Sequence, residues 1–201
     1  MSLESDYRTR YERVLTRLAD AIADQVREYL RSEPRIDRIT GRPKDIVSFL
    51  DKARREEGGK RKYVEPMSQI QDQIGVRIIT FYTSDVARLH DIVLKYFRPI
   101  EIKNHVPESE KEFSYFGRHF ILKVPSDAVA DDMDRSLRPE FFELQIKTLF
   151  QHAWSEAEHD LGYKPGATPL TSEQKRRLAF TSAQAWGADL MFEELFRERH
   201  P

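Results

Sequence analysis

The sequence contains no cysteine and no long apolar run, and neither sign of charge predominates. Without cysteine, the chain has no disulfide bond, no thiolate-bound zinc or iron–sulfur cluster and no cysteine nucleophile. The apolar runs are too short for a helix that crosses a bilayer. The 33 lysines and arginines and the 34 aspartates and glutamates leave a net charge of −1. Because no overall field attracts nucleic acid or a membrane, any site for a polyanion must be a local cluster.

What is present predicts one globular unit. The first ten residues are polar and charged, unlike a signal peptide, so we expect a cytoplasmic protein. The 201 residues are 39% hydrophobic and 11% aromatic, which is enough for a core. Helical and strand patterns alternate, which predicts an α+β fold with a mixed β-sheet packed with helices. We expect an N-terminal helical segment (1–34), a main domain (35–165) and a C-terminal helix (166–201), both terminal helices being amphipathic.

Periodicity and punctuation locate the elements. Apolar residues recur at helical spacing over residues 5–31. Gly41-Arg42-Pro43 is typical of a turn, with Pro43 in the first turn of the next helix, and the charged residues 54–62 are expected to form a loop. Ser84 is predicted to cap another helix. The expected strands are 35–40, 75–82, 100–105, 115–124 and 141–148. The remaining expected helices are 66–73, 149–161 and one capped by Thr171 or Ser172.

A basic cluster surrounds the predicted turn. Arg42 and Lys44 lie at the entry to a helix, and Ser48 and Lys52 share a face of that helix because they are four residues apart. A helix N-terminus with cations beside it favours an anion. The alternative interpretation is a solvated basic surface, and composition alone favours it.

Two further groups could carry chemistry. Asp72 directly precedes a predicted strand, and Glu143 lies in another, on the same side as Gln145 and Lys147. Carboxylates on strands can hold Mg²⁺ against a triphosphate, although spacing alone favours two ordinary exposed acids, because 34 acids give many such pairs. His152, Glu156 and His159 share a helical face, but their spacing differs from that of the HExxH zinc motif, and histidines near a core explain them better.

In their order along the chain, these segments resemble the synthetase domain of the RelA/SpoT family, in particular its small alarmone synthetases. The resemblance spans residues 36–164 and depends on five motifs taken together, because none is specific alone. The motifs are Arg42-x-Lys44 with Ser48 and Lys52; Asp72-x-x-Gly75-x-Arg77; Tyr115 with His119; Glu143-x-Gln145-x-Lys147-Thr148; and a helix with Trp154, Glu158-His159 and Tyr163-Lys164.

The resemblance implies a nucleotidyltransferase-like fold and Mg²⁺-dependent transfer of the ATP β,γ-pyrophosphate to the 3′-hydroxyl of GDP or GTP, giving ppGpp or pppGpp. It implies that Asp72 and Glu143 are catalytic and hold the metal, and that Glu143 could accept the proton of the hydroxyl. The implied ATP-binding residues are Arg42, Lys44, Ser48, Lys52 and Arg77. The implied acceptor-binding residues are Tyr115, His119, Gln145, Lys147, His159 and Lys164.

Two departures from the family pattern leave the acceptor open. Lys147 stands where the family has arginine and lacks its bidentate fork. Phe113 and Ser114 replace the family's Asn-Gly before Tyr115. One alternative is a toxin-like relative that pyrophosphorylates adenine nucleotides or the 3′ end of tRNA, and tRNA is a partner only under that reading. The other is a catalytically silent nucleotide-binding regulator.

Two expectations concern what surrounds the synthetase motifs. The residues before Arg42 contain no histidine, so the family's His-Asp hydrolase site is not expected here. The apolar faces of the terminal helices, and the tetramers formed by relatives of this size, predict a homo-oligomer, either a tetramer or a dimer.

Overall fold

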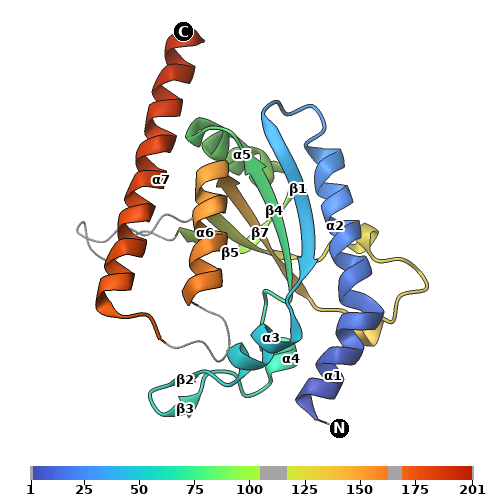
Figure 1. Ribbon diagram of the computed structural model, residues 1–201. Coiled ribbons are helices and arrows are strands. Elements are labelled where there is room, and N and C mark those ends of the chain that lie inside the picture. Colours follow the sequence, from blue (N-terminus) through green and yellow to red (C-terminus); the bar gives the residue numbers. More distant parts are fainter. Residues whose placement is uncertain (1, 105–116, 163–168, 201) are drawn as a thin grey trace.

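The computed structural model describes residues 2–104, 117–162 and 169–200, and its centre is a five-stranded sheet (Figure 1). Adjacent strands follow the order β1-β4-β7-β6-β5. Their bounds are β1 (Ile36–Pro43), β4 (Ile74–Thr80), β7 (Phe141–Thr148), β6 (Arg118–Lys123) and β5 (Pro99–Asn104). The central pair β4–β7 is parallel and the other pairs are antiparallel. The predicted α+β fold with a mixed sheet is therefore confirmed.

Helices cover the sheet, and long helices lie at both ends of the chain as predicted (Figure 1). A π-helical turn (Tyr11–Leu15) joins the first two helices into one continuous rod. The helices are α1 (Leu3–Arg10), α2 (Thr16–Tyr29), α3 (Ile46–Ala53), α4 (Pro66–Gln69), α5 (Thr83–Tyr96), α6 (Leu149–Gly162) and α7 (Ser172–Arg199), with 3₁₀ turns at Ser126–Ala128 and Arg135–Leu137. In the described part of the chain, none of these helices combines the length and apolarity that crossing a membrane requires.

The two faces of the sheet have different chemistry. On β7, Phe142, Leu144 and Ile146 are fully buried in the core, together with apolar side chains of α2 and α5. The alternating residues Glu143 and Gln145 point to the opposite face, where α6 contacts β4 and β7. This alternation was predicted from the sequence, and it leaves one face of the sheet available for polar groups.

The expected turn at Gly41-Arg42-Pro43 is wrong, because these residues form the end of β1 and pair with the start of β4. Gly41 serves close packing rather than a turn: a Cβ there would lie 2.2 Å from the carbonyl oxygen of Ala19 in α2. The helix α3 starts later than expected, with Asp45 as its N-cap, so Pro43 ends a strand instead of opening a helix.

The predicted Ser84 cap of α5 is also wrong. The N-cap position is Tyr82, which makes no side-chain cap bond. Glu193 of α7 supplies the cap, because its Oε2 accepts the Ser84 N–H at 3.0 Å and the Thr83 hydroxyl at 3.1 Å. A residue more than a hundred positions away thus completes this helix end, which no local pattern could have indicated.

The segment 54–62, expected to be a loop, contains a short hairpin of β2 (Glu56–Glu57) and β3 (Lys60–Arg61). Its turn has Gly58 and Gly59 at positive φ, a conformation that glycine adopts without steric cost.

Candidate active site

Two carboxylates meet where adjacent strands begin. Asp72 directly precedes β4, and Glu143 lies in β7 opposite Gly75 of β4. The charge of Glu143 acts to raise the pKa of Asp72, so the two groups are within electrostatic reach of each other. The parallel pairing of β4 and β7 therefore brings together the two acids that the sequence predicts as partners.

Two lysines hold one oxygen of Asp72. Its Oδ2 lies 3.2 Å from Nζ of Lys44 and 2.8 Å from Nζ of Lys52. Burial acts to raise the pKa of Asp72, but the two ammonium groups outweigh it and hold that pKa below its ordinary value. The other oxygen, Oδ1, is buried without a hydrogen-bond partner. Asp72 thus presents a charged carboxylate with one oxygen open to a further ligand.

Glu143 is oriented by its neighbours on the same sheet face. Its Oε1 lies 3.1 Å from Nδ1 of His119, and its Oε2 accepts from Nε2 of Gln145 at 2.6 Å. Burial acts to raise the pKa of Glu143, yet His119, Gln145 and Lys52 lower it to about 2. A carboxylate with so low a pKa is a weak base, so metal binding is the better supported of its two predicted roles.

A row of polar side chains crosses three strands beside these acids. Arg77, Gln145 and His119 lie opposite one another on β4, β7 and β6. Arg77 donates from Nε to Gln145 at 3.2 Å and from Nη1 to Glu156 of α6 at 2.5 Å. Glu156 also lies 3.9 Å from Arg42. The sequence did not indicate that Glu156 contacts both arginines, because these contacts depend on the packing of α6 against the sheet.

Lys147 is buried at the end of this face, 4% exposed, and its Nζ donates to the Ser155 hydroxyl at 2.9 Å. Burial and the nearby Arg77 lower the pKa of Lys147 to about 8, against the opposing effect of Glu156 and Glu143. This lysine therefore loses its charge close to neutral pH, which the arginine usual in the family would not do.

The predicted anion site at the α3 N-terminus needs one correction. The Ser48 N–H is already bonded to Oδ1 of Asp45 at 2.9 Å, so this amide is not available to a ligand. Arg42 lies in β1, and Lys44 directly follows β1. Both residues precede α3 and approach its N-terminus from the strand. The cations rather than the helix amides therefore supply the positive charge.

Several of these groups line one hollow of about 450 Å³, whereas the predicted acceptor residue Lys147 is not in its wall. Tyr11, at the start of the π-helical turn, also lines it, although the sequence indicated only a buried helix face. The predicted residues found in its wall are Arg42, Lys44, Ser48, Asp72, Arg77, Glu143, Gln145 and His159. Lys52 and His119 contact Asp72 and Glu143 directly. Tyr115 and Lys164 lie outside the described residues, so their predicted roles stay predictions.

The residues present fit Mg²⁺ and do not fit a site made wholly of protein ligands. Within the described ranges, no three histidine, aspartate or glutamate side chains form a metal-binding group. Mg²⁺ is commonly held by one or two carboxylates together with substrate phosphates, and the open oxygen of Asp72 beside Glu143 suits that arrangement.

Comparisons with known proteins identify the family of this chain. A family model for the region found in RelA / SpoT proteins matches residues 41–168. The GTP pyrophosphokinase YjbM of Bacillus subtilis (strain 168) is 28% identical over 170 residues, which are 84% of this chain and 75% of YjbM. The GTP pyrophosphokinase YwaC of the same organism is 26% identical over 133 residues, 64% of this chain and 59% of YwaC.

Solved structures share the fold over nearly the whole chain. A GTP pyrophosphokinase family protein from Streptococcus pneumoniae superposes with a TM-score of 0.72 at 25% identity, covering 98% of this chain and 95% of its own. The small alarmone synthetase 1 of Bacillus subtilis bound to its product pppGpp gives a TM-score of 0.74 at 24% identity, covering 95% and 98%. Since the family model spans the strands and helices that build the hollow, this chain belongs to the RelA/SpoT family.

Proposed function

We propose that this chain is a (p)ppGpp synthetase, which transfers the β,γ-pyrophosphate of ATP to the 3′-hydroxyl of GDP or GTP. The observation that carries the proposal is the Asp72 carboxylate, held by Lys44 and Lys52 in the same hollow as Glu143. The family membership and the names of the relatives support the same reaction.

Cations on the donor side would bind the triphosphate. Arg42 and Lys44 line the hollow, and Lys52 adjoins it through its ion pair with Asp72, although the whole chain has a net charge of −1. This is the local cluster that a nearly neutral protein needs for a polyanion. Arg77 would lie against the adenine or the phosphates of ATP. Its hydrogen bonds to Gln145 and Glu156 fix the orientation of its planar guanidinium before ATP binds.

Asp72 and Glu143 would hold Mg²⁺, which would neutralise the negative charge that develops on the transferred group. His119 and Gln145 fix the orientation of the Glu143 carboxylate through their hydrogen bonds. They lie on β6 and β7, toward the side where the acceptor hydroxyl would enter, and we assign them to acceptor placement.

A transfer assay tests the reaction and its alternatives together. The protein is incubated with Mg²⁺ and γ-labelled ATP, with GDP, GTP, GMP, ATP or bulk tRNA offered separately as acceptor. Label on a guanosine nucleotide is expected. Label only on adenosine nucleotides or tRNA would mean that the enzyme uses another acceptor than the guanosine nucleotides. No transfer to any acceptor would favour the catalytically silent regulator.

The pKa of Lys147 predicts an alkaline limit to activity. If its charge binds substrate phosphate, the charged fraction falls as pH rises through about 8, and kcat/KM should drop by about tenfold between pH 7 and pH 9. Lys147→Arg keeps its charge and should give a flat profile over that range. The exposed Lys123→Arg serves as control and should follow the wild type; a falling profile in Lys147→Arg would assign the limit to another group.

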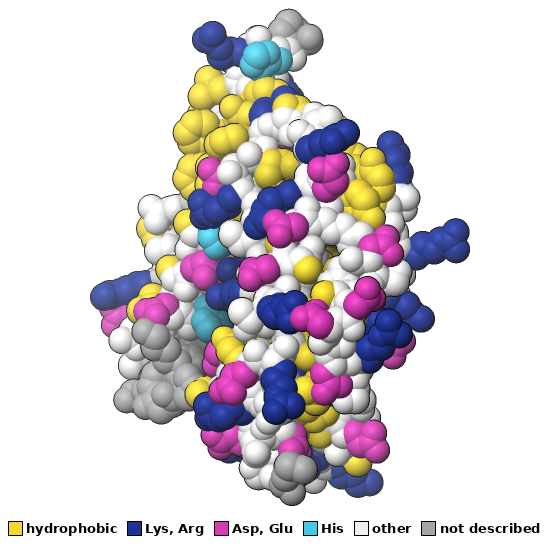
Figure 2. All heavy atoms as spheres, turned by 90° about the vertical axis from the view of Figure 1, so that its right-hand side faces the viewer, with side chains coloured by type: hydrophobic (Ala, Val, Ile, Leu, Met, Phe, Trp, Pro, Cys, Tyr) yellow, Lys and Arg dark blue, Asp and Glu magenta, His cyan; other side chains and the backbone are white. Residues whose placement is uncertain are grey.

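We also propose a homo-oligomer that buries the apolar face of α7. Figure 2 shows opposite charges interspersed over one side of the molecule and hydrophobic side chains gathered at its upper end. The exposed apolar residues of α7 are Phe180, Trp186, Leu190, Met191, Phe192 and Leu195. A helix that leaves so many large apolar side chains in water is typical of an interface.

The double substitution Met191→Glu with Leu195→Glu should convert the oligomer to monomers, as measured by light scattering after size exclusion. Gln184→Glu adds a negative charge to an exposed polar position of the same helix and should leave the mass unchanged. A wild-type protein that is already monomeric at micromolar concentration would refute this interface.

A further inference from the structure

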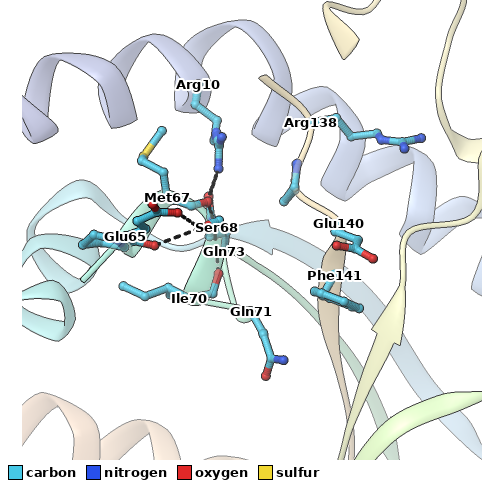
Figure 3. A pocket seen from close by; sticks show the side chains of 12 residues that line it. Arg10, Glu65, Met67, Ser68, Ile70, Gln71, Gln73, Arg138, Glu140 and Phe141 are labelled. Carbon is cyan, nitrogen blue, oxygen red and sulfur yellow. Dashed lines mark hydrogen bonds between the residues drawn. The ribbon is translucent and has the colours of Figure 1, made fainter. Parts of the chain in front are cut away.

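A second hollow, of about 490 Å³, lies on the other side of the segment that carries Asp72. Arg10, at the end of α1, reaches into it from above, α4 and the residues after it form one wall, and the start of β7 forms the opposite wall (Figure 3). None of the groups assigned to pyrophosphate transfer lines this hollow, so its contents need a separate explanation.

Arg10 is a buried cation with too few partners. It is 9% exposed, and its Nη1 donates to the Met67 carbonyl at 2.6 Å and to Oε1 of Gln73 at 2.9 Å. Its Nε is buried with no hydrogen-bond acceptor. In the described segments, no carboxylate lies within ion-pair distance of Arg10. Burial lowers its pKa, but a guanidinium stays protonated at physiological pH, so a full positive charge is left without a counter-charge.

The acidic residues of this hollow lie at its rim. Glu65 and Glu140 are exposed, and Glu140 lies 3.7 Å from Lys123. The Glu65 carboxylate accepts from the Ser68 hydroxyl at 3.4 Å. Solvent screens both acids, whereas the charge of Arg10 is enclosed. An anion that enters would therefore meet the unscreened positive charge of Arg10 inside the hollow and only water-screened negative charge at its rim.

We propose that this hollow binds a small-molecule oxyanion, a phosphate or carboxylate group that pairs with Arg10. The guanidinium lines the hollow and offers such a group charge-assisted N–H donors that no carboxylate of the described segments occupies. The volume exceeds that of the oxyanion alone, and Met67, Ile70 and Phe141 give the remainder of a ligand an apolar wall. The ligand is thus a compact organic molecule with one anionic end.

The site is connected to the Asp72 segment by hydrogen bonds. Gln73, the partner of Arg10, is the neighbour of Asp72 in the chain, and its carbonyl oxygen accepts the Lys44 N–H at 2.8 Å. A bound anion competes with Gln73 for the guanidinium of Arg10. The segment that positions Lys44 and Asp72 then loses its hydrogen bond from Arg10. We therefore expect ligand binding to change the Mg²⁺ concentration that transfer requires. This expectation rests on the proposed function, whereas the binding of the ligand does not.

Calorimetric titration with inorganic phosphate, phenyl phosphate and benzoate tests the site. Because phosphate also suits the candidate active site, the titrations use the full chain carrying Arg42→Ala and Lys52→Ala, and are repeated on wild type saturated with a non-hydrolysable ATP analogue. We expect millimolar or tighter binding, stronger for the two aromatic probes, and a loss of at least about tenfold in Arg10→Met. Binding of phenyl phosphate or of benzoate alone supports the site and identifies the anionic group.

Two further variants keep the test decisive. Arg138→Ala removes an equal charge from an exposed residue of the same lining and should change affinity by less than about twofold. Gln73→Glu puts a buried carboxylate where Oε1 of Gln73 now accepts from Nη1 of Arg10, supplies the missing counter-charge and should abolish binding even if Arg10→Met does not fold. Equal affinity in the parent and in Gln73→Glu, or no binding of any probe at 20 mM, would overturn the proposal whether or not the chain transfers pyrophosphate.

Discussion

Glu143→Gln is expected to reduce pyrophosphate transfer by about 10³-fold while the Kd for ATP changes by less than about threefold. The substitution keeps the size of the side chain but removes the negative charge that His119, Gln145 and Lys52 stabilise. A neutral amide is a poor Mg²⁺ ligand and presents an N–H₂ group to neighbours that now donate to the carboxylate. The loss should therefore fall on kcat rather than on nucleotide binding.

The matched control is Glu140→Gln, three residues earlier on the approach to the same strand and exposed. It should retain wild-type transfer, since it touches no group of the active-site hollow. Rates come from label transfer at saturating ATP, and binding from calorimetry with a non-hydrolysable analogue. Normal turnover by Glu143→Gln would remove Glu143 from both its metal-binding and its proton-accepting role.

Gly41→Ala should destabilise the fold by about 3 kcal/mol, the upper range for overpacking a close contact. The added methyl would lie 2.2 Å from the carbonyl oxygen of Ala19 and 3.1 Å from Cβ of Ala23. Both are parts of a helix that packs along the strand, so relief requires α2 to move away from β1. Because Arg42 follows Gly41 directly, that movement also disturbs the donor side of the site.

Gly187→Ala is the matched control, because a Cβ at that position of α7 meets nothing within 4 Å. There alanine replaces glycine inside a helix and should stabilise by up to about 1 kcal/mol. Urea unfolding with a common m-value measures both changes. Equal stabilities for the two variants would show that the approach of α2 to β1 is looser than the structure has it.

The parts of the fold that could be predicted are those governed by local pattern. The alternation in β7 determines which side chains enter the core, and it predicts that Glu143, Gln145 and Lys147 share one face of the sheet. The errors have non-local causes. Glycine is needed at position 41 because α2 packs closely along β1, and the cap of α5 comes from Glu193 in another helix.

The site shows the same division. Order along the chain and family resemblance indicated most of the residues that line the hollow. The contacts between motifs could not be read in advance: Glu156 reaches Arg77 only through the packing of α6 on the sheet. The low pKa of Glu143 likewise depends on His119, which a neighbouring strand brings within 3.1 Å.

The place of β7 in the sheet has a consequence for how the chain acquires its shape during synthesis. This strand lies between β4 and β6, yet it leaves the ribosome after both. Until it emerges, β1–β4 and β5–β6 are two separate pieces, each with an edge strand whose N–H and C=O groups lack a partner. Closing the parallel β4–β7 pair joins residues 68 positions apart, which is a slow, non-local step. A nascent chain is therefore most vulnerable to aggregation just before β7 emerges from the ribosome, and it has no complete catalytic centre until β7 has paired with β4.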